Sequence, residues 1–324
     1  MNKQWKIGIL GASDIAFKRF LPALEKCNQF IFAGIAARDQ KRCEPFTQQF
    51  GGKIYSDYDA LLQDPEIDCV YLPLPPALHA VWGEKVLKAG KHLLMEKPFS
   101  TDPEDTRRLL ELAQEKGLAV HENYMFLYHG QLAKIRELME SGIFGTVRMI
   151  HTAFTFPFRG ANDFRYSKEL GGGALLDCGG YPLLLAAELL GDDAQLSWAG
   201  LTVDDTYGVD TAGSAVLQNQ AGLTGHVFFG MDDTYRCELE IWGSKASLTA
   251  PRIFTAPADQ PLTLRLRVGN DEQTVEVEGD DQFLNSINTF AQLIGHPEAR
   301  SARCGKILRQ SRLVDAVRQY PKKV

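Results

Sequence analysis

The sequence contains no paired cysteine motif. Its six cysteines are scattered along the chain, and no two of them form a C-x-x-C pair. This pattern is typical of reduced cytosolic thiols and does not indicate a disulfide framework or a zinc site. An H-E-x-x-H motif is missing as well, because His121, Glu122 and His129 lack that spacing. We therefore expect a cytoplasmic protein without a bound metal.

The sequence also has no excess of positive charge. It contains 35 Lys and Arg against 41 Asp and Glu, for a formal net charge of −6. Proteins that bind nucleic acids usually carry a basic patch. We find no apolar run near the roughly 20 residues of a membrane helix, and the N-terminal MNKQWKIGILGA begins a strand without room for a signal peptide. These features predict a small-molecule partner, with no nucleic acid and no membrane.

The 324 residues are 44% hydrophobic and 23% charged, which is the composition of a globular protein with the length of two domains. Up to about residue 122, short apolar runs alternate with helical patterns, as in parallel βαβ units. We expect strands at 6–10, 30–37, 68–74, 92–95 and 119–121, and helices at 15–27, 41–50, 77–89 and 103–116. The first domain (1–122) is therefore predicted to be α/β, with a doubly wound parallel Rossmann sheet.

Beyond residue 122, most apolar runs alternate as strands do. We expect strands at 147–156, 198–203, 211–217, 223–229, 237–242, 262–268 and 273–277, and helices at 132–141, 181–190, 281–293 and 306–318. Consecutive strands separated by turn residues indicate an open, mostly antiparallel sheet. The second domain (123–324) is therefore predicted to be α+β, with a C-terminal helix that can pack back on the first domain.

The stretch GILGASDIA (8–16) lies where the first strand turns into the first helix. Gly11 can supply the tight turn that a pyrophosphate needs, and Ala16 is a small residue at the helix–strand contact. Ser13 replaces the second glycine of the fingerprint, so a glycine turn without a ligand is the alternative. The predicted dinucleotide site includes Gly11, Ala12, Ser13, Asp14 and Ile15.

The end of the second strand bears on the choice of cofactor. It reads Ala36-Ala37-Arg38-Asp39, with Arg42 close behind. An NAD-binding domain usually has an acid at the strand end for the ribose 2′-hydroxyl, whereas Arg can pair with the extra phosphate of NADP. We predict NADP(H), bound near Ala37, Arg38 and Arg42. In the alternative, the arginines are a solvated helix start and Asp39 binds the ribose.

The stretch MEKPFS (95–100) places Lys97 directly after an apolar strand. Ligands of parallel sheets bind at the carboxyl ends of the strands, and Pro98 biases Lys97 toward an extended backbone. Lys97 is therefore a candidate catalytic residue, the alternative being a surface charge ahead of a helix. His79 is expected to be a helix-start residue near the cofactor and not a catalytic base.

Together these motifs resemble the glucose–fructose oxidoreductase/inositol dehydrogenase (Gfo/Idh/MocA) family of nicotinamide-dependent sugar oxidoreductases. The resemblance covers nearly the whole chain and rests on GILGASDIA, DCVYLPLPPALHA, KHLLMEKPFS, ENYMFLYH, GTV and LGGGALLDCGGYPL in this order. It implies a Rossmann domain and an open sheet that carries the substrate pocket and often an oligomer interface, hence a homodimer or homotetramer. It also implies that Lys97 reaches the carbon that exchanges hydride with the nicotinamide. The other cofactor residues that it implies are Leu72, Pro73, Leu74, His79, Glu96, Asn123 and Arg165.

Many family members have Asp and, four residues later, His, where this chain has Asp177 and Tyr181. On a helix start this spacing places both side chains on one face. The resemblance implies that Tyr181 is the proton group, as in the sugar 3-ketoreductase and the dihydrodiol or xylose dehydrogenase branches. A phenol, with a reference pKa of about 10, can donate to the alkoxide formed from a ketone, and Lys97 can stabilise the same oxygen. A core aromatic is the alternative for Tyr181.

The stretch TFPFRGANDFRYSKEL (155–170) closely resembles the nucleotide-sugar 3-ketoreductase branch. Aromatic faces suit a base and arginines suit a diphosphate. A loop with a few core aromatics is the alternative. The expected substrate residues are Lys97, Tyr124, Phe158, Arg159, Asn162, Phe164, Arg165, Asp177 and Tyr181.

The expected function is NADP(H)-dependent reduction of the C3 ketone of a keto-sugar, with a nucleotide-linked deoxysugar as the expected substrate. Two rivals stay open. One is a dehydrogenase of a free sugar or trans-dihydrodiol, with Tyr181 as the base. The other is a catalytically silent, NADP-binding, sugar-sensing regulator, against which the retention of Lys97 and Tyr181 argues.

Overall fold

The computed structural model describes residues 4–320, which form two compact units. Unit 1 contains the chain up to Met125 together with Phe283–Ser311, and unit 2 contains Phe126–Gln282 together with the chain from Arg312 onward. The sequence predicts one boundary near residue 122. The structure shows two further crossings. The chain returns to unit 1 at Phe283 and leaves it again after Ser311, within the last helix.

Unit 1 is built on a parallel sheet that has six strands within the described part of the chain, in the order β3-β2-β1-β4-β5-β6. The strands are β1 (Trp5–Leu10), β2 (Phe30–Ala36), β3 (Lys53–Ile54), β4 (Cys69–Leu72), β5 (His92–Met95) and β6 (Val120–Glu122). This is the strand order of a Rossmann fold, so the predicted fold class is confirmed. The sequence does not predict β3, because two residues are too few to show a strand pattern.

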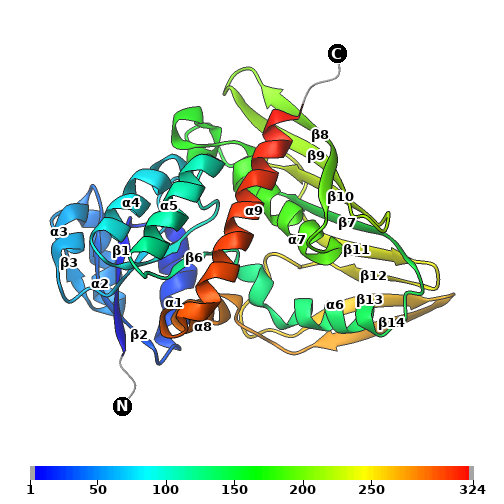
Figure 1. The fold of residues 1–324 in the computed structure, drawn as a ribbon, viewed down its shortest axis with the longest axis horizontal. Helices are drawn as coiled ribbons and strands as arrows, with labels where there is room; N and C mark the ends of the chain where they lie inside the picture. Colours follow the sequence, from blue (N-terminus) through cyan, green and yellow to red (C-terminus); the bar gives the residue numbers. More distant parts are fainter. Residues whose placement is uncertain (1–3, 321–324) are drawn as a thin grey trace. The chain divides into compact units, whose positions relative to one another are not determined.

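Helices connect these strands along the chain, and the last three helical elements of the chain, which follow the strands of unit 2, also contribute to unit 1. The helical elements of unit 1 are the π turn η1 (Ala16–Phe20), α1 (Leu21–Glu25), η2 (Gln40–Cys43), α2 (Glu44–Phe50), α3 (Tyr58–Gln63), η3 (Pro76–Leu78), α4 (His79–Lys88), α5 (Pro103–Glu115), α8 (Gln282–Gly295), η8 (Pro297–Ala299) and α9 (Arg300–Gln319), which continues into unit 2. Asp57 and Asp102 begin α3 and α5 by accepting a backbone N–H of the first turn. In Figure 1, α4 and α5 lie side by side beside the parallel sheet.

The core of unit 1 is made largely by strand residues. Val70, Leu72, Leu93 and Met95 are all fully buried. A parallel sheet covered on both faces gives continuous apolar runs along its strands, which is why these strands are readable in the sequence. The rigid strands fix where the loops at the carboxyl edge of the sheet begin.

Unit 2 is built on a sheet with eight strands among the described residues, in the order β14-β13-β12-β11-β7-β10-β9-β8. The strands are β7 (Val147–Thr155), β8 (Gln195–Asp204), β9 (Val209–Gln218), β10 (Thr224–Gly230), β11 (Arg236–Gly243), β12 (Ala246–Ala250), β13 (Leu262–Val268) and β14 (Asp271–Val277). Neighbours are antiparallel except β7 and β10, which are parallel. The predicted mostly antiparallel sheet is confirmed. The sequence does not predict β12, whose residues are mostly small or polar.

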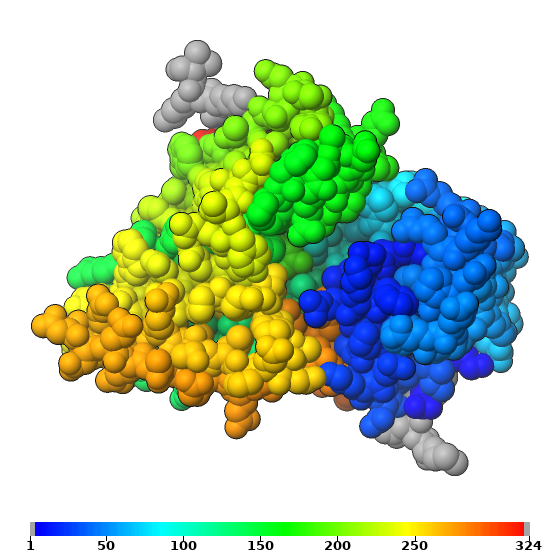
Figure 2. Space-filling model, turned by 180° about the vertical axis from the view of Figure 1, so that it is seen from behind, coloured from blue at the N-terminus to red at the C-terminus, as the bar shows by residue number. Residues whose placement is uncertain are grey.

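One face of this sheet packs against α7 (Gly180–Leu190), and the other is a strand surface. The remaining helical elements of unit 2 are η4 (Met125–Tyr128), α6 (Gly130–Glu140), η5 (Phe164–Tyr166), η6 (Lys168–Leu170) and η7 (Leu175–Gly179). Nearly all of α7 is buried, and it packs against β7 and β10. Along β11, buried residues alternate with more exposed ones, as one-sided burial requires. Figure 2 shows the outer strands of unit 2 at the surface, in yellow and orange.

One segment of unit 2 corrects the expectation that no apolar stretch is long enough for a membrane. Among the described residues, Lys168–Leu190 has the length and composition of a membrane-spanning helix. However, 89% of its most apolar window is buried inside the fold. Burial marks this segment as the central helix of unit 2, so its composition is weak support for a membrane span.

Candidate active site

The loop after β1 has the geometry that the glycine motif predicts. Gly11 has a φ of +112°, and a Cβ at this position would lie 2.8 Å from the side chain of Leu74. Glycine is therefore required both by the backbone and by the close approach of the next loop. Ser13 donates its N–H to the Gly11 carbonyl, and its hydroxyl accepts from Ala16 N at 3.3 Å. The serine in place of the second glycine thus stabilises the turn.

The loop after β2 is cationic and fits the extra phosphate of NADP. Arg38 and Arg42 are exposed, and Arg42 Nη2 donates to the carbonyl oxygen of Ala12 at 2.8 Å. This bond joins the arginine loop to the glycine loop. Asp39, the alternative ribose ligand, caps η2 by accepting from Lys41 N at 3.1 Å. An exposed guanidinium beside the glycine loop suits a phosphate.

Glu96, next to Lys97, is buried and holds a defined set of donors. Its Oε1 accepts from Tyr71 Oη at 2.7 Å and from Asn123 Nδ2 at 2.6 Å. Burial raises the pKa of Glu96, and these two donors oppose the rise. Two hydrogen bonds to one oxygen favour the carboxylate form. A buried carboxylate is thereby fixed one residue before the half-buried Lys97.

The support of Glu96 extends to a helix far along the chain. Ser286 Oγ, in α8, donates to Asn123 Oδ1 at 2.7 Å and lies 2.9 Å from His121 Nε2. Because the serine proton goes to Asn123, its oxygen accepts the proton of His121 Nε2. Burial keeps the pKa of His121 well below its ordinary value, so the ring is neutral. The sequence gives no signal for Ser286, since its contact is made across 163 residues.

Two further buried groups hold the loop that follows Lys97. Glu122 Oε1 accepts from Phe99 N at 2.7 Å, and burial raises the pKa of Glu122 to about 7. His79 is fully buried, with Nδ1 2.7 Å from Pro98 O and Nε2 2.7 Å from Leu74 O. Burial lowers the pKa of His79 to about 4. Both ring nitrogens face backbone carbonyls, in the loops after β4 and β5. A neutral ring carries one N–H, so His79 donates a hydrogen bond to one of these carbonyls and packs against the other.

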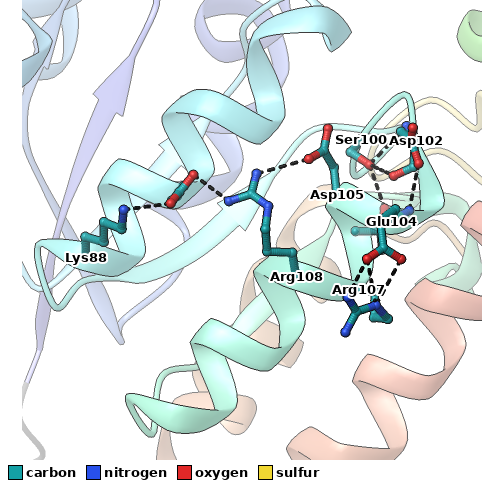
Figure 3. A network of polar contacts seen from close by, with 9 residues as sticks. Lys88, Ser100, Asp102, Glu104, Asp105, Arg107 and Arg108 are labelled. Atoms are coloured by element: carbon teal, nitrogen blue, oxygen red, sulfur yellow. Dashed lines mark hydrogen bonds and ion pairs between the residues drawn. The ribbon is translucent and has the colours of Figure 1, made fainter.

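The loop that follows β5 ends at the first turn of α5, which is capped by side chains. Ser100 Oγ donates to the carbonyl oxygen of Asp102 at 2.5 Å, and Asp102 Oδ1 accepts from Glu104 N at 2.7 Å. Figure 3 shows this cap beside a series of ion pairs on α5 that includes Arg108. Such exposed ion pairs contribute little to stability. The hydrogen bond from Glu104 N to the Asp102 side chain marks the first turn of α5, and the loop that begins after β5 ends there.

Unit 2 carries the second half of the predicted site in one continuous helical run. Gly180 N–H bonds to Leu175 O, five residues earlier, so η7 is a π turn, and it continues into α7. Asp177 lies in the π turn, and Tyr181 follows in α7. A π turn inside a helix often occurs at functional sites. Both predicted side chains are buried, and the sequence misses only the wider turn between them.

The ring of Tyr181 is held by aromatic neighbours. Its centroid is 5.7 Å from that of Phe126, 5.2 Å from Phe154 and 5.7 Å from Phe254. Edge and tilted contacts of this kind are favourable and restrict ring orientation. The ring of Tyr181 is thus packed among aromatic side chains, and its role as the proton group stays a prediction.

Arg165 is paired with two carboxylates of unit 2. Its Nε lies 2.6 Å from Asp177 Oδ2 and its Nη1 3.0 Å from Asp163 Oδ1. Burial lowers the pKa of Arg165, but the two carboxylates outweigh it and the net pKa is raised. The guanidinium also lies 4.6 Å from the ring centroid of Phe164. Arg165 thus orients Asp177, and Asp163 is a second partner of Arg165 that the sequence analysis does not single out.

An exposed aromatic face lies in the neighbouring loop. The Phe158 side chain is 46% exposed, and its ring is 4.8 Å from that of Tyr166, which is 5.0 Å from Tyr207. Tyr166 Oη donates to Met231 O at 2.7 Å, which fixes the middle ring. Tyr207 comes from the turn between β8 and β9, so only the fold brings it to Tyr166.

The structure thus places the predicted residues in two groups. In unit 1, at the carboxyl edge of the sheet, lie Gly11, Ala12, Ser13, Asp14, Ile15, Ala37, Arg38, Arg42, Leu72, Pro73, Leu74, His79, Glu96, Lys97, Asn123 and Tyr124. In unit 2 lie Phe158, Arg159, Asn162, Phe164, Arg165, Asp177 and Tyr181. The Leu72, Asn123 and Tyr124 side chains are buried, and Leu72 and Asn123 belong to the core cluster and the hydrogen-bond network, respectively.

These features define a Rossmann-type oxidoreductase with an added open-sheet domain. A family model described as an oxidoreductase family with an NAD-binding Rossmann fold matches residues 5–124, and the GFO/IDH/MocA C-terminal domain model matches residues 132–249. The chain belongs to the Gfo/Idh/MocA family of oxidoreductases, as the motifs predict.

Relatives are similar over nearly the whole chain. A dTDP-3,4-didehydro-2,6-dideoxy-α-D-glucose 3-reductase of Streptomyces violaceoruber is 39% identical over 97% of this chain and 94% of its own, and the Actinomadura kijaniata enzyme of that name is 40% identical with the same coverage. The solved 3-ketoreductase of Actinomadura kijaniata with NADP and TDP-benzene matches with a TM-score of 0.95 at 38% identity, over 98% and 97% of the two chains. Structures of that enzyme also exist with a tyrosine changed to phenylalanine and a lysine changed to alanine or glutamate.

Proposed function

We propose that this protein is an NADPH-dependent ketoreductase that reduces the C3 ketone of a nucleotide-linked keto-deoxysugar. The observation that carries the proposal is the pair Lys97 and Tyr181. Buried hydrogen bonds hold the residues on either side of Lys97 in unit 1, and aromatic side chains pack around Tyr181 in unit 2. Relatives of that activity match nearly the full length, and variants of one of them change a lysine and a tyrosine.

The proposed chemistry divides into a hydride and a proton. NADPH, when bound, supplies the hydride to the ketone carbon. Lys97 stabilises the negative charge that develops on the ketone oxygen, through its ammonium charge and a hydrogen bond. Tyr181 donates its phenolic proton to that oxygen, which completes the alcohol, and is reprotonated from solvent. Asp177, held by Arg165, lies four residues before Tyr181 in the same helical run.

The proposed recognition of the nucleotide uses the loop of unit 2. The exposed ring of Phe158, backed by Tyr166 and Tyr207, offers a face on which a base can stack. Arg159 lies beside it, with its guanidinium 4.6 Å from the Phe156 centroid, and is exposed for a diphosphate. A free sugar has neither group and gains nothing from these contacts.

The test is turnover with NADPH against a panel of substrates. The panel contains a dTDP-linked 3-keto-deoxysugar, the same sugar without the nucleotide, and, with NADP⁺, free aldoses and a trans-dihydrodiol. The nucleotide-linked ketone should have the highest kcat/KM. Preference for a free aldose or dihydrodiol supports the dehydrogenase rival, and NADPH binding without any turnover supports the regulator.

We also propose a homodimer or homotetramer that pairs through the strand surface of unit 2. This surface has a hollow of about 540 Å³. It is lined by Met149, His151, Ala153, His226, Phe228, Arg236, Glu238, Glu240 and Trp242. Trp242 is 47% exposed. The lining mixes apolar side chains with histidines and charged side chains of both signs. A strand surface of this kind can pair with a second copy of itself across a two-fold axis.

The proposed setting is the cytoplasm. All six cysteines are free thiols, and five of them are buried. Unpaired buried thiols suit a reducing compartment. This supports the compartment that the sequence predicts.

A further inference from the structure

Asp210, near the start of β9, contacts the beginning of the helical run that contains Tyr181. Its Oδ2 accepts a hydrogen bond from Leu175 N, with the two atoms 2.6 Å apart. Leu175 is the first residue of η7, and its own N-cap residue, Ala174, offers no side-chain acceptor. The first N–H groups of a helix lack partners within the helix. A carboxylate from a neighbouring strand therefore replaces the missing local cap.

The approach of Asp210 depends on Gly173. Gly173 has a φ of +113°, and a Cβ there would lie 2.4 Å from Asp210 Oδ1. Glycine both adopts this backbone and leaves room for the carboxylate. The carbonyl of Gly173 in turn accepts from Asp177 N at 3.0 Å. The turn that precedes Tyr181 is thus fixed by Asp210 on one side and by Gly173 on the other.

The surroundings of Asp210 show that the contact is more than a surface cap. Burial raises the pKa of Asp210, and the Leu175 N–H and the charge of Arg318 oppose this rise. A carboxylate is costly to bury unless donors compensate it, and it is favourable at the positive end of a helix dipole. The backbone of β9 pairs with β8 and β10 without any help from this side chain. The sheet itself therefore does not require an acid at this position.

The position of Tyr181 follows from how its helical run begins. Its ring contacts Phe126, Phe154 and Phe254, which restrict the plane of the ring. The π turn that Asp210 caps leads without interruption into α7, which carries Tyr181 near its start. We propose that Asp210 is a positioning residue for Tyr181: its carboxylate fixes the start of the helical run that carries the proton donor. This inference rests on the proposed role of Tyr181.

The first test compares two replacements of Asp210. Asp210→Ala removes the acceptor, whereas Asp210→Asn keeps an oxygen that can accept from Leu175 N. A misplacement of about 1 Å can cost about 10²-fold in rate, so kcat of Asp210→Ala should fall by that order while the Kd of NADPH stays unchanged. Asp210→Asn should recover most of the loss.

Asn219→Ala is the matched control. Asn219 directly follows β9, and its Nδ2 donates to Leu190 O, at the other end of α7, at 2.9 Å. The control thus removes a polar contact with the same helix from a residue just after the same strand, together with the bond that Asn219 Oδ1 accepts from Leu223 N. Its melting temperature should fall, but its kcat should equal that of the wild type.

A second readout needs no substrate. With 3-fluorotyrosine in all ten tyrosine positions, the ¹⁹F signal of Tyr181 is identified by its loss in Tyr181→Phe. The signal should shift or broaden in Asp210→Ala, and less in Asp210→Asn, which serves if the alanine variant does not fold. A moved signal in a protein that reduces no keto-sugar supports the positioning role and refutes the proposed function. An unmoved signal in both Asp210 variants, or an equal change in Asn219→Ala, overturns the inference.

Discussion

Single residues decide the chemistry of this protein, and most of them act through their buried neighbours. Lys97 follows Glu96, whose carboxylate is held by Tyr71 and Asn123. Tyr181 is held by a ring of phenylalanines. The backbone next to Lys97 and the ring of Tyr181 are thereby held by buried contacts, and such preorganisation lowers the entropic cost of a reactive arrangement.

Replacement of Lys97 and Tyr181 should separate chemistry from folding. Tyr181→Phe keeps the ring packing and removes only the proton donor, so turnover should fall by about 10²–10⁴-fold while NADPH still binds. Lys97→Ala should cause a loss of about 10²–10³-fold. Because both groups act on one oxygen, the double variant should lose far less than the product of the two. Steady-state kinetics and NADPH titration measure these effects. A Tyr181→Phe enzyme with nearly full turnover means that another group donates the proton.

Arg38 should set the preference for the phosphorylated cofactor. The wild-type protein should bind NADP(H) at least about tenfold more tightly than NAD(H), a gap of about 1.4 kcal/mol. Arg38→Ala should shrink this gap, because the exposed guanidinium next to the buried Ala37 is lost. Fluorescence titration of the two reduced cofactors measures the affinities. Equal wild-type affinities would refute the assignment.

Glu122 should make stability decrease as pH rises. Burial raises its pKa from 4.5 to about 7 in the folded state, so the folded protein binds more protons than the unfolded chain between these values. Stability is therefore lost as pH rises through this range, by about 2–3 kcal/mol between pH 5 and pH 8. Glu122→Gln keeps an acceptor for Phe99 N and cannot titrate. Urea unfolding at both pH values should show a smaller decrease for Glu122→Gln, and equal decreases for the two proteins contradict the burial effect.

Whole elements decide which of these residues meet. Helix α8 brings Ser286 to Asn123 and His121, although the serine lies far along the chain. The strands β4, β5 and β6 end at one edge, so that Glu96, directly after β5, lies beside Tyr71 in β4 and Asn123 directly after β6. Parallel strands align their carboxyl ends, and ligand sites form there for this reason.

Replacing Ser286 tests the contribution of α8. Ser286→Ala removes a hydroxyl and leaves two buried polar groups, on Asn123 and His121, without that contact. The expected loss of unfolding free energy is about 1–3 kcal/mol. Thr289→Val is the control, since Thr289 Oγ1 bonds only to Asn285 O of its own helix, at 2.9 Å, and such local bonds matter little. Thermal unfolding compares the two variants. Equal losses of unfolding free energy would show that the contact of Ser286 with Asn123 stabilises the protein no more than a local bond does.

At the scale of the whole molecule, the two units differ in how their sheets are buried. The parallel sheet of unit 1 has a fully buried core, whereas the sheet of unit 2 packs α7 on one face and presents strands on the other. The strand surface carries exposed apolar side chains such as Trp242 among charged ones, and apolar side chains gathered on a surface can mark an interface. In a symmetric oligomer, the strand surface of one copy can be covered by the same surface of a second copy.

Light scattering tests this assembly. The wild-type protein at micromolar concentration should have a mass of two or four times 36.1 kDa. Trp242→Glu places a charge in the apolar part of the strand surface and should shift the mass toward the monomer. Val81→Glu, at an exposed apolar position of α4, should leave the mass unchanged. A monomeric wild-type protein refutes the proposal.

The sequence by itself determined the periodic and the local features. Continuous apolar runs predicted β1, β4 and β5, because a parallel sheet buries both of its faces. Gly11 and Lys97 could be singled out, because turn chemistry and the strand end are encoded within a few neighbouring residues. The replacement of histidine by Tyr181 was also visible, because it falls within one short motif.

Only the tertiary structure decided the contacts between distant segments. Ser286, Asp210 and Tyr207 belong to no motif, and each acts through a partner on another element. The return of Phe283–Ser311 to unit 1 is likewise a matter of packing. Periodicity reports which face of an element is buried but not which element covers it. Candidate reactive groups could therefore be named from the sequence, but the contacts that Ser286, Asp210 and Tyr207 make could not.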